Sequence, residues 1–117
     1  MTKILDNLSK QLKNMKMIAD LKEHYEYIKI TTLLELNHSN ECFMLYAQET
    51  EDGILITDLN EILEGTSFYE IPDEIVEKLA SKHKLIFDGK YVFALTSLEN
   101  INQTIENFFN LVKELNI

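Results

Sequence analysis

The dipeptide Asp52-Gly53 stands between two apolar runs and constrains the fold more than any other feature of the sequence. Asp and Gly tolerate the positive φ angles of a tight primed turn, so the pair predicts a β-hairpin. Its strands are the run Cys-Phe-Met-Leu-Tyr-Ala over 42–47 and the run Ile-Leu-Ile-Thr over 54–57. A third strand is expected over 26–35, where Tyr, Lys and Thr alternate with Ile and Thr. Three consecutive strands predict an antiparallel meander.

Apolar residues recur in steps of three and four near both ends of the chain, which is typical of helices that bury one face. The first stretch, 3–22, predicts a helix with lysines on its opposite face. The last begins at Thr96 and Glu99, which have the spacing of a capping box, and runs to the end of the chain. Its stripe contains adjacent Phe108 and Phe109. Because one helix face cannot take both rings, we expect Phe109 at an edge or in a dimer contact.

Two shorter helices are expected between these ends. Asp58 and Glu61 have capping spacing at the start of the first, which should end at Gly65. Pro72 opens the second helix, which should run to about Lys82.

A second hairpin is expected around Asp88-Gly89, between strands over 85–87 and 91–94. The chain of 117 residues fits a single domain, 1–117. Runs of strands and runs of helices, rather than strict alternation, predict an α+β fold. We expect a mainly antiparallel sheet of about five strands, a meander plus a hairpin, packed on one face by the long N- and C-terminal helices.

The formal net charge of −9 is concentrated in one segment. Residues 31–77 contain twelve Asp and Glu and no Lys, whereas the segments before and after have small positive balances. Nucleic-acid affinity depends on Lys and Arg that neutralise phosphates, and the chain has no Arg, so we expect no direct nucleic-acid binding. No apolar run is long enough for a signal peptide or a membrane span, and the single cysteine, Cys42, suits a reducing compartment. A soluble, intracellular protein is expected.

The sequence contains no catalytic motif. Its three histidines and its cysteine lack the spacing of a metal site: His24, His38, Cys42 and His83. A strained turn that presents a nucleophile and a glycine-rich phosphate loop are both missing from the sequence. We therefore expect no enzyme activity, no metal and no cofactor.

Residues 31–77, the acidic segment, have the features of a binding surface. Carboxylates on a rigid sheet and helix edge can imitate DNA, which presents one negative charge per about 1.7 Å. Phe68 and Tyr69 are aromatic anchors of the kind that protein interfaces use. We predict a protein partner with a basic surface, bound by Glu49, Glu51, Asp52, Asp58, Glu61, Glu64, Phe68, Tyr69, Glu70, Asp73 and Glu74.

Residues 30–58 include Ile-Thr-Thr-Leu-Leu-Glu-Leu-Asn, then Phe-Met-Leu-Tyr-Ala, then Asp-Gly-Ile-Leu-Ile-Thr-Asp. This stretch resembles the phage-associated domain-of-unknown-function family numbered 1828. Sequences of that family have one strand that opens with Ile-Thr-Pro and another that ends in Thr-Asp-Asp-Gly. Leu33 stands in place of the proline, and Asp58 matches one residue of the acidic pair. The resemblance implies a phage or mobile-element setting.

These observations favour a non-enzymatic acidic protein that inhibits a host nucleic-acid-handling defence complex, such as a nuclease complex of the CRISPR or restriction type, by occupying its basic nucleic-acid-binding surface. A second hypothesis is an accessory or adaptor module that acts through homodimerisation or other protein–protein contacts, with the acidic face serving solubility only. A third is a metal-dependent hydrolase without a recognised motif.

Overall fold

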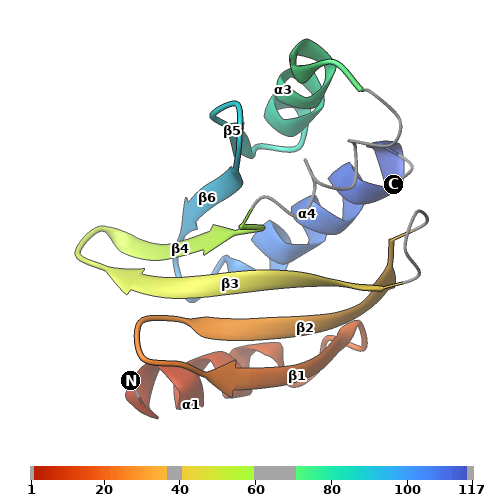
Figure 1. The fold of residues 1–117 in the computed structure, drawn as a ribbon. Coiled ribbons are helices and arrows are strands. Elements are labelled where there is room, and N and C mark those ends of the chain that lie inside the picture. The colour runs from red at the N-terminus through yellow and green to blue at the C-terminus, as the bar shows by residue number, and fades with distance from the viewer. Residues whose placement is uncertain (1, 37–40, 60–70, 116–117) are drawn as a thin grey trace.

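The computed structural model describes residues 2–36, 41–59 and 71–115 of the chain, with side chains from Asp6 onward. In chain order the elements are α1 (Thr2–Leu12), β1 (Ile18–Glu23), β2 (Ile28–Glu35), β3 (Cys42–Thr50), β4 (Gly53–Thr57), α3 (Asp73–Lys82), β5 (Ile86–Phe87), β6 (Val92–Thr96) and α4 (Ile101–Leu115) (Figure 1). The helix expected from Asp58 to Gly65 lies largely outside the described residues.

The strands form one six-stranded sheet in the order β1-β2-β3-β4-β6-β5, and every neighbouring pair is antiparallel. This confirms the α+β fold and the meander, with six strands where about five were expected. The first hairpin is confirmed, but the pairing of Thr50 with Gly53 places its turn at Glu51-Asp52, and of Asp52 and Gly53 only Gly53 has a positive φ. The second hairpin is confirmed as well, and it extends the sheet because β6 pairs with β4.

The single helix predicted over 3–22 is wrong, and its second half supplies the sixth strand. The first helix, α1, ends at Leu12, and β1 follows from Ile18 to Glu23. Leu21 pairs with Ile30 of β2, and the N–H of His24 donates to the carbonyl of Tyr27 at 2.8 Å across a tight turn. Backbone hydrogen bonds to a neighbouring strand outweigh a local helical pattern, and periodicity within the segment cannot reveal them.

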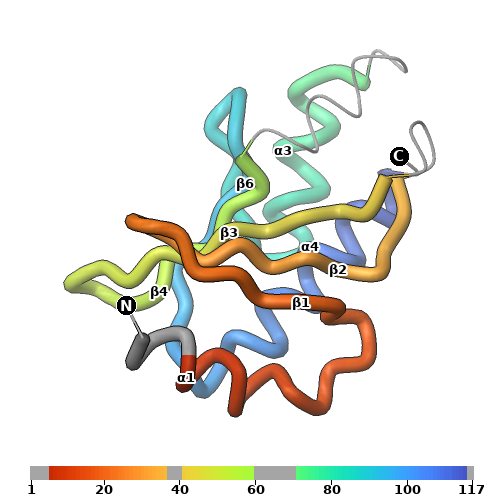
Figure 2. The backbone as a smooth tube through the Cα atoms, turned by 60° about the horizontal axis from the view of Figure 1, so that its bottom comes forward, coloured from red at the N-terminus to blue at the C-terminus, as the bar shows by residue number. Residues whose placement is uncertain are grey.

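The core lies between the sheet and the helices. Alternate residues of the central strands are buried, as in Ile28 and Ile30 of β2 and Phe43 and Leu45 of β3. Figures 1 and 2 show α1 and α4 on the same side of the sheet, which confirms the expected covered face. The other face of the sheet carries no helix in the part of the chain that the structure describes.

The expectation that Phe109 lies at an edge or in a dimer contact is wrong. Phe108 and Phe109 are both buried, with 0% and 1% of their surface exposed. The reason is the position of α4, which contacts β6 and α1 and also packs against α3. A helix with neighbours on several sides can bury two adjacent rings on different faces.

The capping box predicted at Thr96 and Glu99 is also wrong. Thr96 is the last residue of β6 and pairs with Ile54 of β4, so its backbone is held in a strand. The helix α4 begins at Ile101. Thr96 is instead tied to the first turn of α4 through its side chain, because the Thr104 hydroxyl donates to the Thr96 hydroxyl oxygen at 2.8 Å.

Candidate functional site

Three of the predicted acidic residues lie together at the end of the β3–β4 hairpin. Glu49, Glu51 and Asp52 are all exposed there, and we call them the acidic tip. They line a hollow of about 430 Å³ together with Asn7 of α1 and residues 97–98, which follow β6. The β3–β4 hairpin that carries the acidic tip projects at the left of Figure 1.

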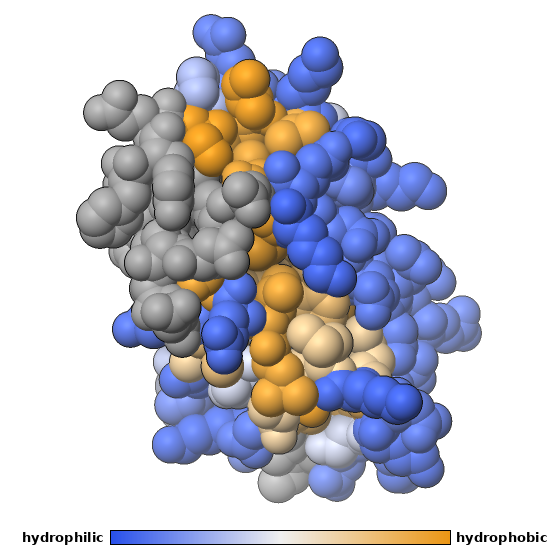
Figure 3. Space-filling view, turned by 90° about the vertical axis from the view of Figure 1, so that its right-hand side faces the viewer, coloured by the Kyte–Doolittle hydropathy of each residue, from blue (hydrophilic) through white to orange (hydrophobic). Residues whose placement is uncertain are grey.

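The structure does not gather all the predicted acids on one surface. Asp73 and Glu74 are exposed in the first turn of α3, where negative charge favours the helix dipole. This end of α3 lies far from the acidic tip (Figure 1). Figure 3 shows a third face, at the end of the molecule where the chain ends, with a band of apolar residues beside hydrophilic ones. The exposed acids of the predicted site therefore lie in two separate places, the acidic tip and the first turn of α3.

Asp58 does not belong to an exposed binding surface, and its assignment as a partner-binding residue is wrong. It is fully buried, and its carboxylate accepts a hydrogen bond from the backbone N–H of Val92 at 2.9 Å. The physical reason is its position directly after β4, where the neighbouring strand β6 begins. The remaining predicted site residues lie outside the described residues: Glu61, Glu64, Phe68, Tyr69 and Glu70.

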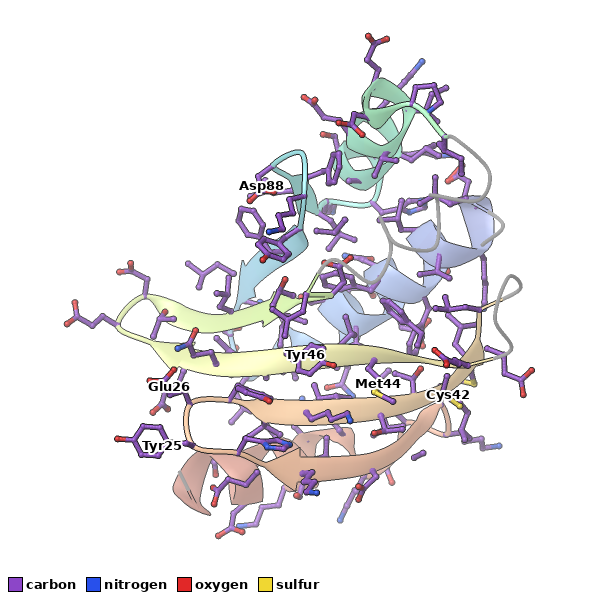
Figure 4. The ribbon with its side chains drawn as sticks, viewed as in Figure 1. Tyr25, Glu26, Cys42, Met44, Tyr46 and Asp88 are labelled. Carbon is purple, nitrogen blue, oxygen red and sulfur yellow. The ribbon has the colours of Figure 1, made fainter. Side chains whose placement is uncertain are left out.

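A second candidate surface is the face of the sheet that no described helix covers. We call this face the outer face. Side chains alternate between the two faces of a strand, so the outer face takes every second residue. Its large apolar and aromatic side chains come from four strands: Tyr27 just before β2, Leu33 of β2, Met44 and Tyr46 of β3, Leu55 of β4, and Phe93 and Leu95 of β6. Figure 4 shows Met44 and Tyr46 on the side of the sheet that faces the viewer, with α4 behind it.

The strand register places these side chains in rows across the sheet. Tyr46 pairs with Lys29 on one side and with Thr57 on the other, and Thr57 pairs with Phe93. A second row runs from Gln48 through Leu55 to Leu95. In an antiparallel sheet with one open face, the open face is commonly polar, so the aromatic and apolar members of these rows are unusual.

Aromatic contacts order one corner of the outer face. The ring of Tyr27 meets the ring of Tyr46 edge-on, with 5.5 Å between centroids and 71° between planes. The ring of His24 stacks on Tyr27 at 4.7 Å. Such arrangements are favoured for ring pairs and hold the three side chains in place.

Beside the tyrosine pair the surface is hollowed by about 130 Å³, and Glu26, Tyr27, Tyr46, Gln48, Leu55 and Leu59 are among the residues that line the hollow. Sites for cofactors and drug-sized ligands span about 300–1,000 Å³. The hollow is smaller than this range and suits one side chain of a partner.

Metal-ligating side chains do not assemble into a site in the described ranges, where no group of three or more His, Cys, Asp or Glu could hold an ion. His83 is engaged by Glu114 of α4, with 2.6 Å between its Nε2 and Glu114 Oε2. Cys42 is a free thiol of intermediate exposure.

Sequence reasoning singled out the acids and missed most of the outer face. The signal was present in the strand patterns, because the positions between the buried residues of β3 and β4 include Met44, Tyr46 and Leu55 where polar residues are typical. The alternation of residues in β3 and β4 does not show which face of the sheet the helices cover.

No helix among the described residues is long and apolar enough to cross a membrane. Comparison of the chain with protein-family models, with curated proteins and with solved structures gives no match.

Proposed function

We propose that this protein is a non-enzymatic binding module that acts through protein–protein contacts made by its outer face. The observation that carries the proposal is the row of half-buried aromatic and apolar side chains across a sheet face that no described helix covers. Apolar side chains grouped on one surface mark interaction sites on soluble proteins.

The composition of the outer face indicates a protein as the partner. Tyr, Phe and Met are enriched in protein interfaces. The hollow beside Tyr46 offers a place for one anchoring side chain. Lys29 and Gln48 stand at the ends of the two rows, and Lys22 lies beside Lys29 on the outer face, so the apolar side chains have polar neighbours toward β1 and β2.

Affinity capture from host lysate with matched variants tests this proposal. Tyr46→Ser removes the ring at the centre of the outer face, and Lys78→Asp changes an exposed residue of α3 on another part of the surface. We expect the wild-type protein and Lys78→Asp to capture the same partner and Tyr46→Ser to lose it. Truncation of an interface hot spot costs about 2 kcal/mol or more, which is about a thirtyfold loss of affinity. A partner retained equally by all three proteins contradicts the proposal.

The acidic tip supports a second candidate, the inhibitor of a host nucleic-acid-handling defence complex that the sequence favours. Three exposed carboxylates on one hairpin, Glu49, Glu51 and Asp52, offer a compact negative surface to a basic groove. This function would place the protein in the cytoplasm of a bacterial host, in the phage or mobile-element setting that residues 30–58 suggest.

The two candidates are separated by the salt dependence of binding. Contacts made by exposed charges weaken as salt screens them, whereas apolar contacts do not. Reversal of all three charges of the acidic tip to Lys should abolish inhibition by the second mechanism and leave binding through the outer face intact.

A further inference from the structure

One edge of the sheet is a strand with a free side. Among the strands that the structure describes, β1 pairs with β2 and has no other neighbour. It is six residues long, and Ala19, Asp20 and Lys22 are exposed. The opposite edge, β5, is only two residues long. Unpaired N–H and C=O groups on an edge strand are a template for pairing with another chain.

The hydrogen-bond pattern shows which backbone groups of β1 face outward. Antiparallel partners alternate between hydrogen-bonded and non-hydrogen-bonded pairs. The N–H of His24 donates to the carbonyl of Tyr27, so these two residues form a hydrogen-bonded pair. Along the register from this pair, Lys22 and Lys29 form the next hydrogen-bonded pair, and Leu21 and Ile30 form a non-hydrogen-bonded pair. The N–H and C=O of Leu21 therefore point away from β2, toward the free side.

A groove runs beside this edge, between β1 and α1. It has a volume of about 320 Å³ and is lined by Ser9, Leu12 and Lys13 of α1 and by residues 18–21. We call it the β1 groove. It leaves room for side chains of a strand that pairs with β1.

We propose that the occupant is a second copy of this chain, which pairs its β1 antiparallel to the first about a two-fold axis at Leu21. The two Leu21 residues then exchange backbone hydrogen bonds, since the outward groups of each are aimed at the other. This interface is separate from the outer-face binding proposed above and holds whether or not that proposal is correct.

The charge pattern of β1 is complementary to itself in this register. With Leu21 opposite Leu21, Asp20 of each copy lies opposite Lys22 of the other, so the interface contains two opposite-charge pairs. These are non-hydrogen-bonded pairs, in which side chains approach most closely. Both residues lie on the outer face, because they pair with Thr31 and Lys29 of β2. Directly opposed unlike charges stabilise strand pairing, and like charges destabilise it.

Charge-swapped variants test the proposal by sedimentation equilibrium and by light scattering of the full chain over a series of concentrations. The wild-type protein should form a dimer. Asp20→Lys places Lys opposite Lys, and Lys22→Asp places Asp opposite Asp, so each single variant should raise the dimer dissociation constant by at least about tenfold. The double variant Asp20→Lys/Lys22→Asp restores two opposite-charge pairs and should dimerise like the wild-type protein. An equimolar mixture of the two single variants should form a heterodimer.

The control is Lys78→Asp, which makes the same charge change on α3 and should dimerise normally. Circular dichroism of every variant checks that the fold is kept, and recovery of the dimer in the double variant excludes misfolding of the single variants as the cause. A wild-type protein that is monomeric at all concentrations overturns the proposal. So does a dimer that both single variants retain, because the interface then lies elsewhere.

Discussion

The carboxylate of Asp58 accepts a hydrogen bond from the backbone N–H of Val92, and both residues are fully buried. The backbone completes a reciprocal link, because the N–H of Asp58 donates to the carbonyl of Val92 at 3.1 Å. The hydroxyl of Thr57 donates to the same carbonyl, also at 3.1 Å. This cluster joins the end of β4 to the start of β6, two strands that are far apart in the sequence.

Asp58→Ala should lower the free energy of unfolding by about 1–3 kcal/mol, because it leaves the buried N–H of Val92 without its acceptor. Asp58→Asn keeps an acceptor oxygen but buries an additional amide donor, so its stability should lie between those of Ala and the wild type. Urea unfolding monitored by circular dichroism measures the effect. Glu51→Ala, at an exposed turn position, is the control and should change stability by less than about 0.5 kcal/mol. Equal stability of Asp58→Ala and Glu51→Ala would show that the Val92 contact is unimportant.

Phe109→Ala should destabilise the fold by about 3–5 kcal/mol, the usual cost of removing a buried ring. The ring is 1% exposed, so the loss combines apolar burial with the cavity that remains. Tyr25→Ala is the matched control, since Tyr25 is 91% exposed and should contribute little. Thermal unfolding compares the two variants. If Phe109→Ala instead kept the wild-type melting temperature and changed the oligomeric state, Phe109 would be an interface residue after all.

Glu114 should stabilise the fold in a pH-dependent way. Hydrogen bonds from Lys82 and then His83 hold the pKa of the Glu114 carboxyl below its ordinary value of 4.5. A carboxyl whose pKa is lowered in the folded state contributes stability above its unfolded pKa and loses it as the pH falls through the folded pKa. Glu114→Gln should therefore lower the melting temperature slightly at neutral pH, and the difference from the wild type should vanish on acidification below 4.5.

The control for Glu114 is Glu106→Gln on the same helix, an exposed residue for which no ion pair is found among the described residues. Its melting temperature should follow that of the wild type across the same pH series. A Glu114→Gln difference that persists unchanged in acid would contradict a role for the ionised carboxylate.

Gly53→Ala should destabilise the β3–β4 hairpin for two reasons. Gly53 has a φ of +141°, which L side chains rarely adopt, and an added Cβ would lie 2.7 Å from the backbone carbonyl oxygen of Thr96. Backbone strain of this kind costs about 1–3 kcal/mol. Gly89→Ala separates the two causes, because Gly89 has a φ of +97° but no atom within 4 Å of the added Cβ. Chemical denaturation should rank Gly53→Ala as the less stable variant, and the reverse order would show that the contact with Thr96 does not matter.

Local features of the sequence predicted much of the fold. The hairpin turns near Gly53 and Gly89, the alternation in β2 and the apolar stripe of α4 are encoded within a few residues of one another. They could be predicted because glycine geometry and side-chain periodicity act at short range. The same reasoning failed at 18–23, since the hydrogen bonds that make this segment a strand come from β2.

The candidate site was less predictable than the fold. The sequence identified the acidic tip, because its residues are consecutive or nearly so, but it could not separate Asp58, which is buried, from Asp52, which is exposed. Nor could it show that the tip and the start of α3 point to different regions.

By itself the sequence determined the α+β class, the two hairpins and the uneven distribution of charge, all of which follow from local backbone preference and composition. The tertiary structure alone decided that β1 is an edge strand, that Phe109 is internal and that Tyr46 and Phe93 lie on the face that no described helix covers. These properties depend on which surfaces meet when distant segments pack, and burial belongs to the assembled fold rather than to any single segment.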